Sequence, residues 1–143
     1  HQTLPSMLDY KIHIKNDSMY NTPPVFCVYA VNETLKWINN LGGLESIESM
    51  NNTKAELLYN EIDENKLFRC PVSYEDRSNM NVVFTFSDQS KNDNDFLDFC
   101  SKRGLNTLKG HRSVGGFRAS IYNAMPIQGV KELTKAMREY SKK

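Results

Sequence analysis

The sequence predicts an α+β fold, in which helices pack on a small antiparallel sheet and a helical hairpin precedes that sheet. Two observations support this fold class. Apolar residues recur every three to four positions over 28–62 and 127–140, as they do on one face of a helix. Between these regions, short runs alternate apolar and polar residues, which is typical of strands with one buried face. Sheet and helices would form two layers.

The first two helices are expected in the N-terminal half of the chain. Residues 1–20 show no steady periodicity and are expected to form an extended arm. Thr22 and the prolines at 23–24 predict a helix start, because threonine caps free amides and proline is tolerated in the first turn. The glycine pair at 42–43 ends this helix, and a second helix is expected over 44–62. The expected inner faces are Val28, Val31, Leu35 and Ile38 in the first helix and Ile47, Leu57, Leu58 and Ile62 in the second.

The second half of the chain predicts strands mixed with two further helices. Asp93 is expected to cap a third helix, which Gly104 would close. Pro126 opens a last helix whose expected inner face is Val130, Leu133, Met137 and Tyr140. The expected strands are 67–70, 81–86, 105–109 and 117–122, and the last two would form a hairpin with a wide loop.

Composition narrows the function classes. The 143 residues are 39% hydrophobic and 24% charged, which is ordinary for a soluble globular protein. The net charge of +1 provides no general attraction to nucleic acid or to an anionic membrane, and neither partner is expected. The most apolar stretch, 24–38, is too short and too polar to span a bilayer, and the N-terminus lacks the layout of a signal peptide.

Cysteine usage indicates a reducing compartment. Cys27, Cys70 and Cys100 are odd in number and widely spaced, which argues against a disulfide framework and fits a cytoplasmic protein. The sequence contains neither a CxxC nor an HxxxH spacing, so no metal site is expected.

The most informative segment is 110–126, which reads GHRSVGGFRASIYNAMP. It places His111, Arg112 and Arg118 around a glycine pair, and guanidinium groups bind carboxylates and phosphates through two parallel hydrogen bonds. In a strand over 117–122, Arg118 shares one face with Ser120 and Tyr122. The two guanidinium groups and the imidazole are cationic or potentially cationic, and they repel one another when they lie close together. A bound small anion would neutralise them, so the segment predicts a small-anion site. A solvated basic turn explains the same residues and, on the residues alone, is slightly favoured.

A second candidate anion site lies at the start of the first long helix. Asn21 and Thr22 precede a helix N-terminus, where free amides and the helix dipole attract phosphate. Ordinary N-capping is the simpler interpretation, and the two are not exclusive.

Several segments together resemble the phosphoserine aminotransferase family, whose members are pyridoxal-phosphate enzymes of fold type I. The similarity rests on residues 110–126 and on four further segments that run in the family's order. These are SMYNTPP at 18–24, KW at 36–37 with GG at 42–43, KAELLY at 54–59 with ID at 62–63, and DRSNMNVVF at 76–84. The resemblance covers nearly the whole chain and implies the C-terminal small domain of such an enzyme.

The resemblance assigns roles to residues of this chain. Arg118 would bind the substrate's α-carboxylate, and His111 and Arg112 would hold the phosphate of 3-phosphohydroxypyruvate or phosphoserine, or the side-chain carboxylate of glutamate. Asn21 and Thr22 would reach the phosphate of pyridoxal 5′-phosphate across a homodimer interface. The implied reaction moves an amino group from glutamate to 3-phosphohydroxypyruvate, giving phosphoserine and 2-oxoglutarate for serine biosynthesis and, in many bacteria, pyridoxine biosynthesis. Residues 1–23 would end the large domain, and 24–143 would form the small domain with its leading helices.

One departure from the family decides what the chain can do alone. The family's Schiff-base lysine lies in a GxQKN context upstream of the NTPP segment, and this context does not occur here. The chain is therefore expected to be the C-terminal portion of the enzyme, with no catalytic residue of its own. Two alternatives stay open: a stand-alone module that binds a phosphoserine-like dianion, and a structural part without ligand affinity until it joins its large domain.

Overall fold

The computed structural model describes residues 4–143, which divide into two compact units. The first unit ends at Leu41 and the second runs from Gly42 to Lys143. The predicted domain boundary at 23–24 lies within the first unit and stays a prediction. The predicted hairpin of the first two long helices spans both units and also stays a prediction.

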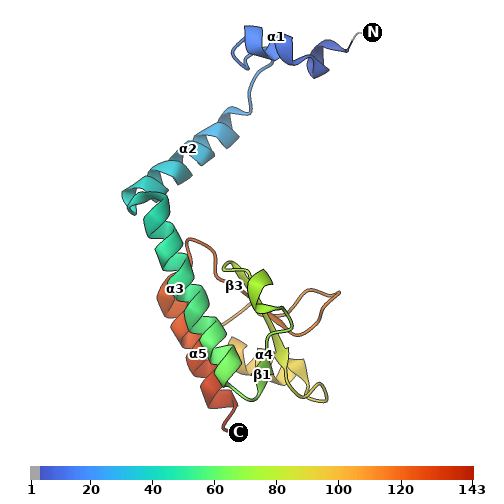
Figure 1. Ribbon diagram of the computed structural model, residues 1–143, viewed down its shortest axis with the longest axis vertical. Helices are drawn as coiled ribbons and strands as arrows, with labels where there is room; N and C mark the ends of the chain where they lie inside the picture. The colour runs from blue at the N-terminus through green and yellow to red at the C-terminus, as the bar shows by residue number, and fades with distance from the viewer. Residues whose placement is uncertain (1–3) are drawn as a thin grey trace. The chain divides into compact units, whose positions relative to one another are not determined.

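The first unit contains η1 (Ser6–Leu8), α1 (Tyr10–Lys15) and α2 (Val25–Asn40), as Figure 1 shows. The expected extended arm is thus wrong over 10–15. Asp9 caps α1 by accepting a hydrogen bond from the Lys11 amide at 3.0 Å, a local signal that hydrophobic periodicity does not report. The expected Thr22 cap is also wrong, because α2 begins at Val25 and Pro24 occupies the N-cap position without a side-chain bond.

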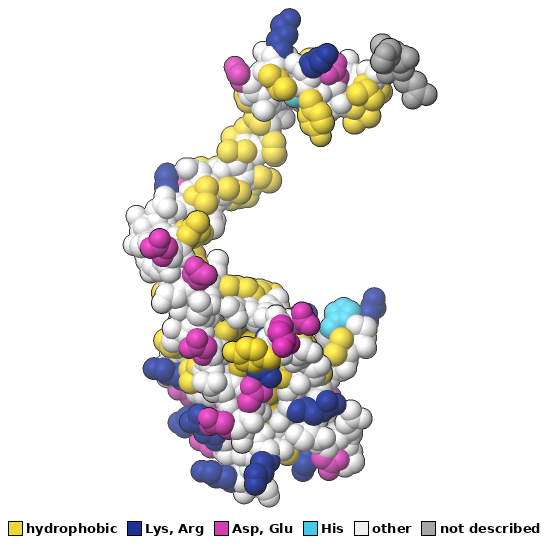
Figure 2. All heavy atoms as spheres, viewed as in Figure 1, with side chains coloured by type: hydrophobic (Ala, Val, Ile, Leu, Met, Phe, Trp, Pro, Cys, Tyr) yellow, Lys and Arg dark blue, Asp and Glu magenta, His cyan; other side chains and the backbone are white. Residues whose placement is uncertain are grey.

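Helix α2 buries none of its sixteen residues within its own unit. Most of its apolar side chains are exposed, including Val28, Val31 and Leu35 of the expected inner face, and Figure 2 shows yellow hydrophobic groups along it. Phe26 is 80% exposed and Val25 65% exposed. A contiguous apolar surface of this kind on a helix is typical of a face that meets other protein.

The second unit is a three-stranded antiparallel sheet with helices packed on it (Figure 1). The sheet order is β1-β2-β3, with Phe68 opposite Phe86 and Val83 opposite Arg118. Helix α3 packs against α5 and the first two strands, and α4 packs against α5. The elements are α3 (Gly43–Glu64), β1 (Phe68–Arg69), η2 (Tyr74–Asp76), β2 (Asn81–Phe86), α4 (Asp93–Ser101), β3 (Phe117–Ser120) and α5 (Ile127–Tyr140).

The core lies between one face of the sheet and the helices. Phenylalanine rings from β1, β2, β3 and α4 form its centre, with Phe96 and Phe117 centroids 4.9 Å apart in an edge-to-face arrangement. Alternation along β2 buries Val82, Phe84 and Phe86, as the sequence predicts. The expected inner faces of α3 and α5 are largely confirmed, since Ile47, Leu58, Ile62, Val130, Leu133 and Met137 are buried and only Leu57 and Tyr140 remain half-buried.

Two local expectations in this unit need correction. Residues 105–109 do not form a strand: only Lys109 makes an isolated bridge, to Phe117. Thr107 has φ +61°, which breaks the extended backbone that a strand requires. The third helix is capped by Asn92 rather than Asp93, because the Asn92 side chain accepts from the Asn94 amide at 3.1 Å.

A buried lysine fixes the connection between β3 and α5. Lys54 of α3 is 2% exposed, and its ammonium donates to the carbonyls of Ile121, Tyr122 and Met125 at 3.2, 2.7 and 3.1 Å. Burial lowers its pKa from the ordinary value. These bonds tie α3 to the chain that leaves β3, directly after Arg118 and Ser120.

Candidate small-anion site

The loop that carries His111 and Arg112 is closed at its base by two glycines. The Gly110 amide donates to the Gly116 carbonyl at 2.8 Å. A Cβ on Gly110 would lie 2.0 Å from the Gly115 carbonyl oxygen, so no side chain fits there. Gly116 has φ +60°, and a Cβ on it would lie 2.6 Å from Thr85 Cγ2 of the neighbouring strand. The glycines thus let the two arms of the loop approach each other and the sheet.

His111 and Arg112 lie exposed in this loop. His111 Nδ1 lies 2.7 Å from Ser113 Oγ and accepts a hydrogen bond from the Ser113 amide at 3.3 Å. Because an amide can only donate, Nδ1 is the acceptor, and the neutral imidazole carries its proton on Nε2. Nε2 has no hydrogen-bond partner within residues 4–143 and is a free donor.

Arg118 lies on the face of β3 that points away from the core, as the sequence predicts. It is half-buried, and its Nε is buried without any hydrogen-bond acceptor in the described chain. None of the ion pairs within residues 4–143 involves this guanidinium. A half-buried cation without a counter-ion is costly, which makes Arg118 the residue best suited to bind an anion.

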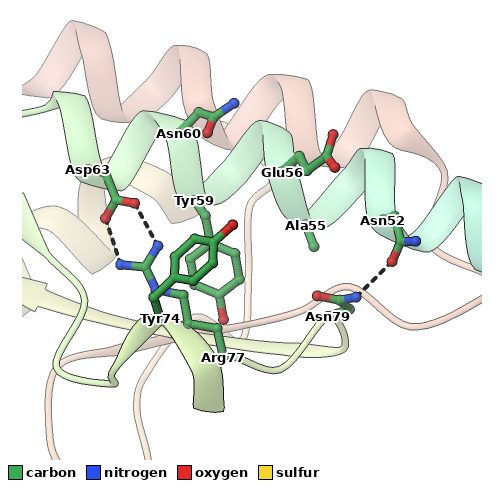
Figure 3. A pocket seen from close by; sticks show the side chains of 9 residues that line it. All are labelled: Asn52, Ala55, Glu56, Tyr59, Asn60, Asp63, Tyr74, Arg77 and Asn79. Atoms are coloured by element: carbon green, nitrogen blue, oxygen red, sulfur yellow. Dashed lines mark hydrogen bonds and ion pairs between the residues drawn. The ribbon is translucent and has the colours of Figure 1, made fainter.

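The other half-buried arginine shows the contrast (Figure 3). Arg77 forms two parallel hydrogen bonds to Asp63 at 2.6 and 2.8 Å, and its guanidinium lies over the rings of Tyr59 and Tyr74 at 4.7 and 5.4 Å. The Asp63 hydrogen bonds raise the pKa of Arg77, and burial raises the pKa of Tyr59 to about 12. The pocket of about 260 Å³ around it therefore contains a cation that is already neutralised.

Polar side chains continue the face on which Arg118 lies. Asn81 of β2 stands opposite Ser120, and its Oδ1 accepts from Ser120 Oγ at 3.1 Å and from the Tyr122 hydroxyl at 3.2 Å. The pKa of Tyr122 is lowered by hydrogen bonding to Ser120 and Asn81, with a smaller contribution from the positive charge of Arg118. The alternation within 117–122 predicts Ser120 and Tyr122 on this face, but it cannot indicate Asn81, which belongs to another strand.

Asn21 and Thr22 lie in the first unit, and both are exposed. The side-chain amide nitrogen of Asn21 donates to Met7 Sδ at 3.2 Å. No side chain caps the N-terminus of α2, and the backbone amides of Phe26 and Cys27 have no acceptor within residues 4–143. Free amides beside exposed amide and hydroxyl side chains suit a phosphate group.

Comparison with known proteins places the chain in a family. A model of the aminotransferase class-V family matches residues 3–133. The chain belongs to the class-V aminotransferases. No helix within residues 4–143 is long and apolar enough to cross a membrane.

The curated relatives of this class-V aminotransferase chain are named phosphoserine aminotransferases, which confirms the resemblance seen in the sequence. The one from Azobacteroides pseudotrichonymphae is 55% identical over 140 residues, covering 97% of this chain and 39% of the relative. The one from Porphyromonas gingivalis is 52% identical over 141 residues, covering 98% and 39%. The chain thus spans about 39% of the length of these relatives.

Solved structures confirm the predicted fold class. The phosphoserine aminotransferase from Bacillus circulans subsp. alkalophilus superposes with a TM-score of 0.86 at 44% identity, covering 97% of this chain and 38% of that one. The pyridoxal-phosphate-bound phosphoserine aminotransferase from Trichomonas vaginalis gives a TM-score of 0.82 at 45% identity, covering 96% and 39%.

Proposed function

We propose that this chain is the substrate-binding part of a pyridoxal-phosphate-dependent phosphoserine aminotransferase. The whole enzyme would move an amino group from glutamate to 3-phosphohydroxypyruvate in cytoplasmic serine biosynthesis, and would serve pyridoxine biosynthesis in bacteria that use this route. The observation that carries the proposal is Arg118, a half-buried cation with no counter-ion within residues 4–143, in a chain about half identical to phosphoserine aminotransferases.

The substrates of this reaction carry two anionic ends, and the chain offers donors for both. Arg118 would grip the α-carboxylate with two parallel N–H groups. Arg112 and the Nε2–H of His111 would hold the distal phosphate or carboxylate. The closed loop base at Gly110 and Gly116 fixes the chain between these groups, which supports two sites at a set separation.

The N-terminus of α2 fits the phosphate of the cofactor. In a homodimer, this helix N-terminus would reach across the interface and hold the phosphate of the cofactor bound in the other subunit. The groups that would hold it are the side chains of Asn21 and Thr22 and the uncapped backbone amides of Phe26 and Cys27. The bound cofactor supplies the electron sink for amino transfer. The exposed apolar face of α2 supports contact with further protein in the complete enzyme.

The test is an amide NMR titration of this chain with O-phospho-L-serine, with separate arms for glutamate and pyridoxal phosphate. We expect saturable shifts around Arg118, His111 and Arg112 with phosphoserine, and around Asn21 and Thr22 with pyridoxal phosphate.

Arg118→Ala should abolish the phosphoserine shifts, whereas Arg69→Ala, at an exposed arginine on β1, should leave them unchanged. Equal loss in both variants would indicate a general charge effect and overturn the assignment of Arg118.

Turnover measurements test the role of the missing lysine context. With glutamate, 3-phosphohydroxypyruvate and pyridoxal phosphate supplied, the chain alone is expected to form no phosphoserine. Detectable formation of phosphoserine would contradict the proposal that catalysis requires residues outside this chain.

A further inference from the structure

The side-chain amide of Asn81 is held by two hydroxyl groups from the neighbouring strand and its extension. Ser120 Oγ and the Tyr122 hydroxyl both donate to Asn81 Oδ1, at 3.1 and 3.2 Å. The Asn81 backbone amide donates to Ser78 Oγ at 3.1 Å, which fixes the start of the strand as well. An amide oxygen has two lone pairs, so these two bonds use its full capacity.

The amide nitrogen of Asn81 remains free. Within residues 4–143, Nδ2 donates to no acceptor, although its orientation is set by the bonds to Oδ1. Two asparagines near it use theirs: Asn79 Nδ2 donates to Asn52 Oδ1 at 2.8 Å, and Asn51 Nδ2 donates to Asn123 Oδ1 at 2.8 Å. Asn81 therefore presents two N–H groups that are oriented but unused.

These free donors lie on the same face of the sheet as Arg118. Asn81 pairs with Ser120 and Val83 pairs with Arg118, so Asn81 and Arg118 are diagonal neighbours across antiparallel strands. Such diagonal neighbours have Cα atoms roughly 7–8 Å apart, within reach of a shared ligand for long side chains. The effect of Arg118 on the pKa of Tyr122 agrees with this proximity.

We propose that Asn81 supplies a second hydrogen-bond donor to the carboxylate that Arg118 binds, and that Ser120 and Tyr122 are positioning residues for its amide. The inference rests on the proposed function, since it extends the site assigned to Arg118. A carboxylate has two acceptor oxygens in one plane, and an arginine on one side with an oriented amide on the other constrains how that plane lies. Asn81 would thus help to fix the orientation of the substrate.

The test follows side-chain signals directly. The Asn81 NH₂ pair and the Arg118 Nε–H signal are observed by ¹H–¹⁵N NMR while L-glutamate is added to the chain, with inorganic phosphate as a separate arm. The NH₂ pair is assigned by its absence in Asn81→Ala. Both signals are expected to shift with glutamate and to give one dissociation constant, and the Asn81 pair should respond less to inorganic phosphate at equal concentration.

Variants separate binding from positioning. Asn81→Ala is expected to weaken glutamate binding about tenfold or more, because it removes a hydrogen bond to a charged group. Tyr122→Phe and Ser120→Ala should each weaken it roughly twofold to tenfold, because the amide keeps only one orienting bond. Asn79→Ala is the matched control, and its affinity should stay within about twofold of the wild type.

The outcomes distinguish this inference from the function on which it rests. If Arg118 Nε–H shifts and the Asn81 pair does not, the role of Asn81 is refuted while the anion site stands. If inorganic phosphate moves the Asn81 pair as strongly as glutamate, the assignment to a carboxylate is refuted. If neither side chain responds to glutamate, both the inference and the proposed site of Arg118 in this chain fail.

Discussion

Replacing Lys54 with methionine gives the sharpest test of how the second unit holds its C-terminal elements together. Methionine has nearly the length of lysine without its charge, so Lys54→Met removes the interaction while filling similar space. The ammonium donates to three carbonyl groups in the segment between β3 and α5. These groups are 67 to 71 residues away in sequence, so the lysine connects α3 to a distant part of the chain.

The size of the effect follows from the environment of the three carbonyls. A hydrogen bond from a charged group contributes about 1.5–3 kcal/mol, and a buried carbonyl left without a partner costs about 1–3 kcal/mol. The bond to Ile121 is buried, whereas those to Tyr122 and Met125 are partly buried, so water replaces the lysine at the latter two. Burial lowers the pKa of Lys54, which indicates that desolvation of the ammonium offsets part of the gain. We expect a net loss of about 3 kcal/mol.

The assay is urea unfolding followed through the backbone amide signals of β2 and β3. These signals report on the second unit, whereas the fluorescence of Trp37 reports on the first. The matched control is Lys135→Met on the exposed face of α5, which should change the stability by less than about 0.5 kcal/mol. A loss below about 1 kcal/mol in Lys54→Met would refute the argument that these bonds determine the stability of the connection.

Three further predictions concern other contacts. Burial raises the pKa of the Cys100 thiol in the folded state to about 12. Above pH 9 the thiol is therefore deprotonated in the unfolded state but not in the folded state, and the stability falls as pH rises from 9 toward 12. From an ordinary thiol pKa of 9.0 in the unfolded state, this loss at pH 10 is about 1.4 kcal/mol, and an equally steep decline in Cys100→Ala would count against it. Gly116→Ala should cost about 2–4 kcal/mol in thermal unfolding, because the new Cβ would clash with Thr85. Gly115→Ala, whose Cβ would meet no atom within 4 Å, should cost about 1 kcal/mol, and equal costs in the two variants would contradict the clash. Asp63→Asn should lose about 1–2 kcal/mol in urea unfolding by breaking the Arg77 pair, and a loss no larger than in Asp76→Asn would show that the pair adds nothing.

Several elements could be predicted from the sequence because their signals are local. The alternation of Val82, Phe84 and Phe86 predicted β2 with its bounds, since each apolar residue of a strand faces the same side. The same alternation placed Arg118 on the outer face of β3. The strand expected over 105–109 failed because Thr107 adopts a left-handed conformation that composition does not reveal. Helix α1 was missed because its cap at Asp9, rather than an apolar face, marks its start.

The candidate site shows where local signals end. The sequence predicted His111, Arg112 and Arg118, because their guanidinium and imidazole groups lie within a few residues of one another and of a glycine pair. That Arg118 has no counter-ion, whereas Arg77 pairs with Asp63, could not be predicted, because either arginine could have met an acidic residue from elsewhere in the chain. Asn81 was missed for a related reason, since its contact with Ser120 spans 39 residues and depends on strand register.

The sequence by itself determined the α+β class, the buried faces of α3, α5 and β2, the family resemblance and the residues able to hold an anion. It did so because apolar periodicity and charged groups act over a few residues. Only the tertiary structure decided which of those charges are neutralised, which hydrogen bonds Lys54 makes, and that Asn81 lies beside Arg118 with a free amide. These facts depend on which distant segments meet, and that is set by how the whole core packs.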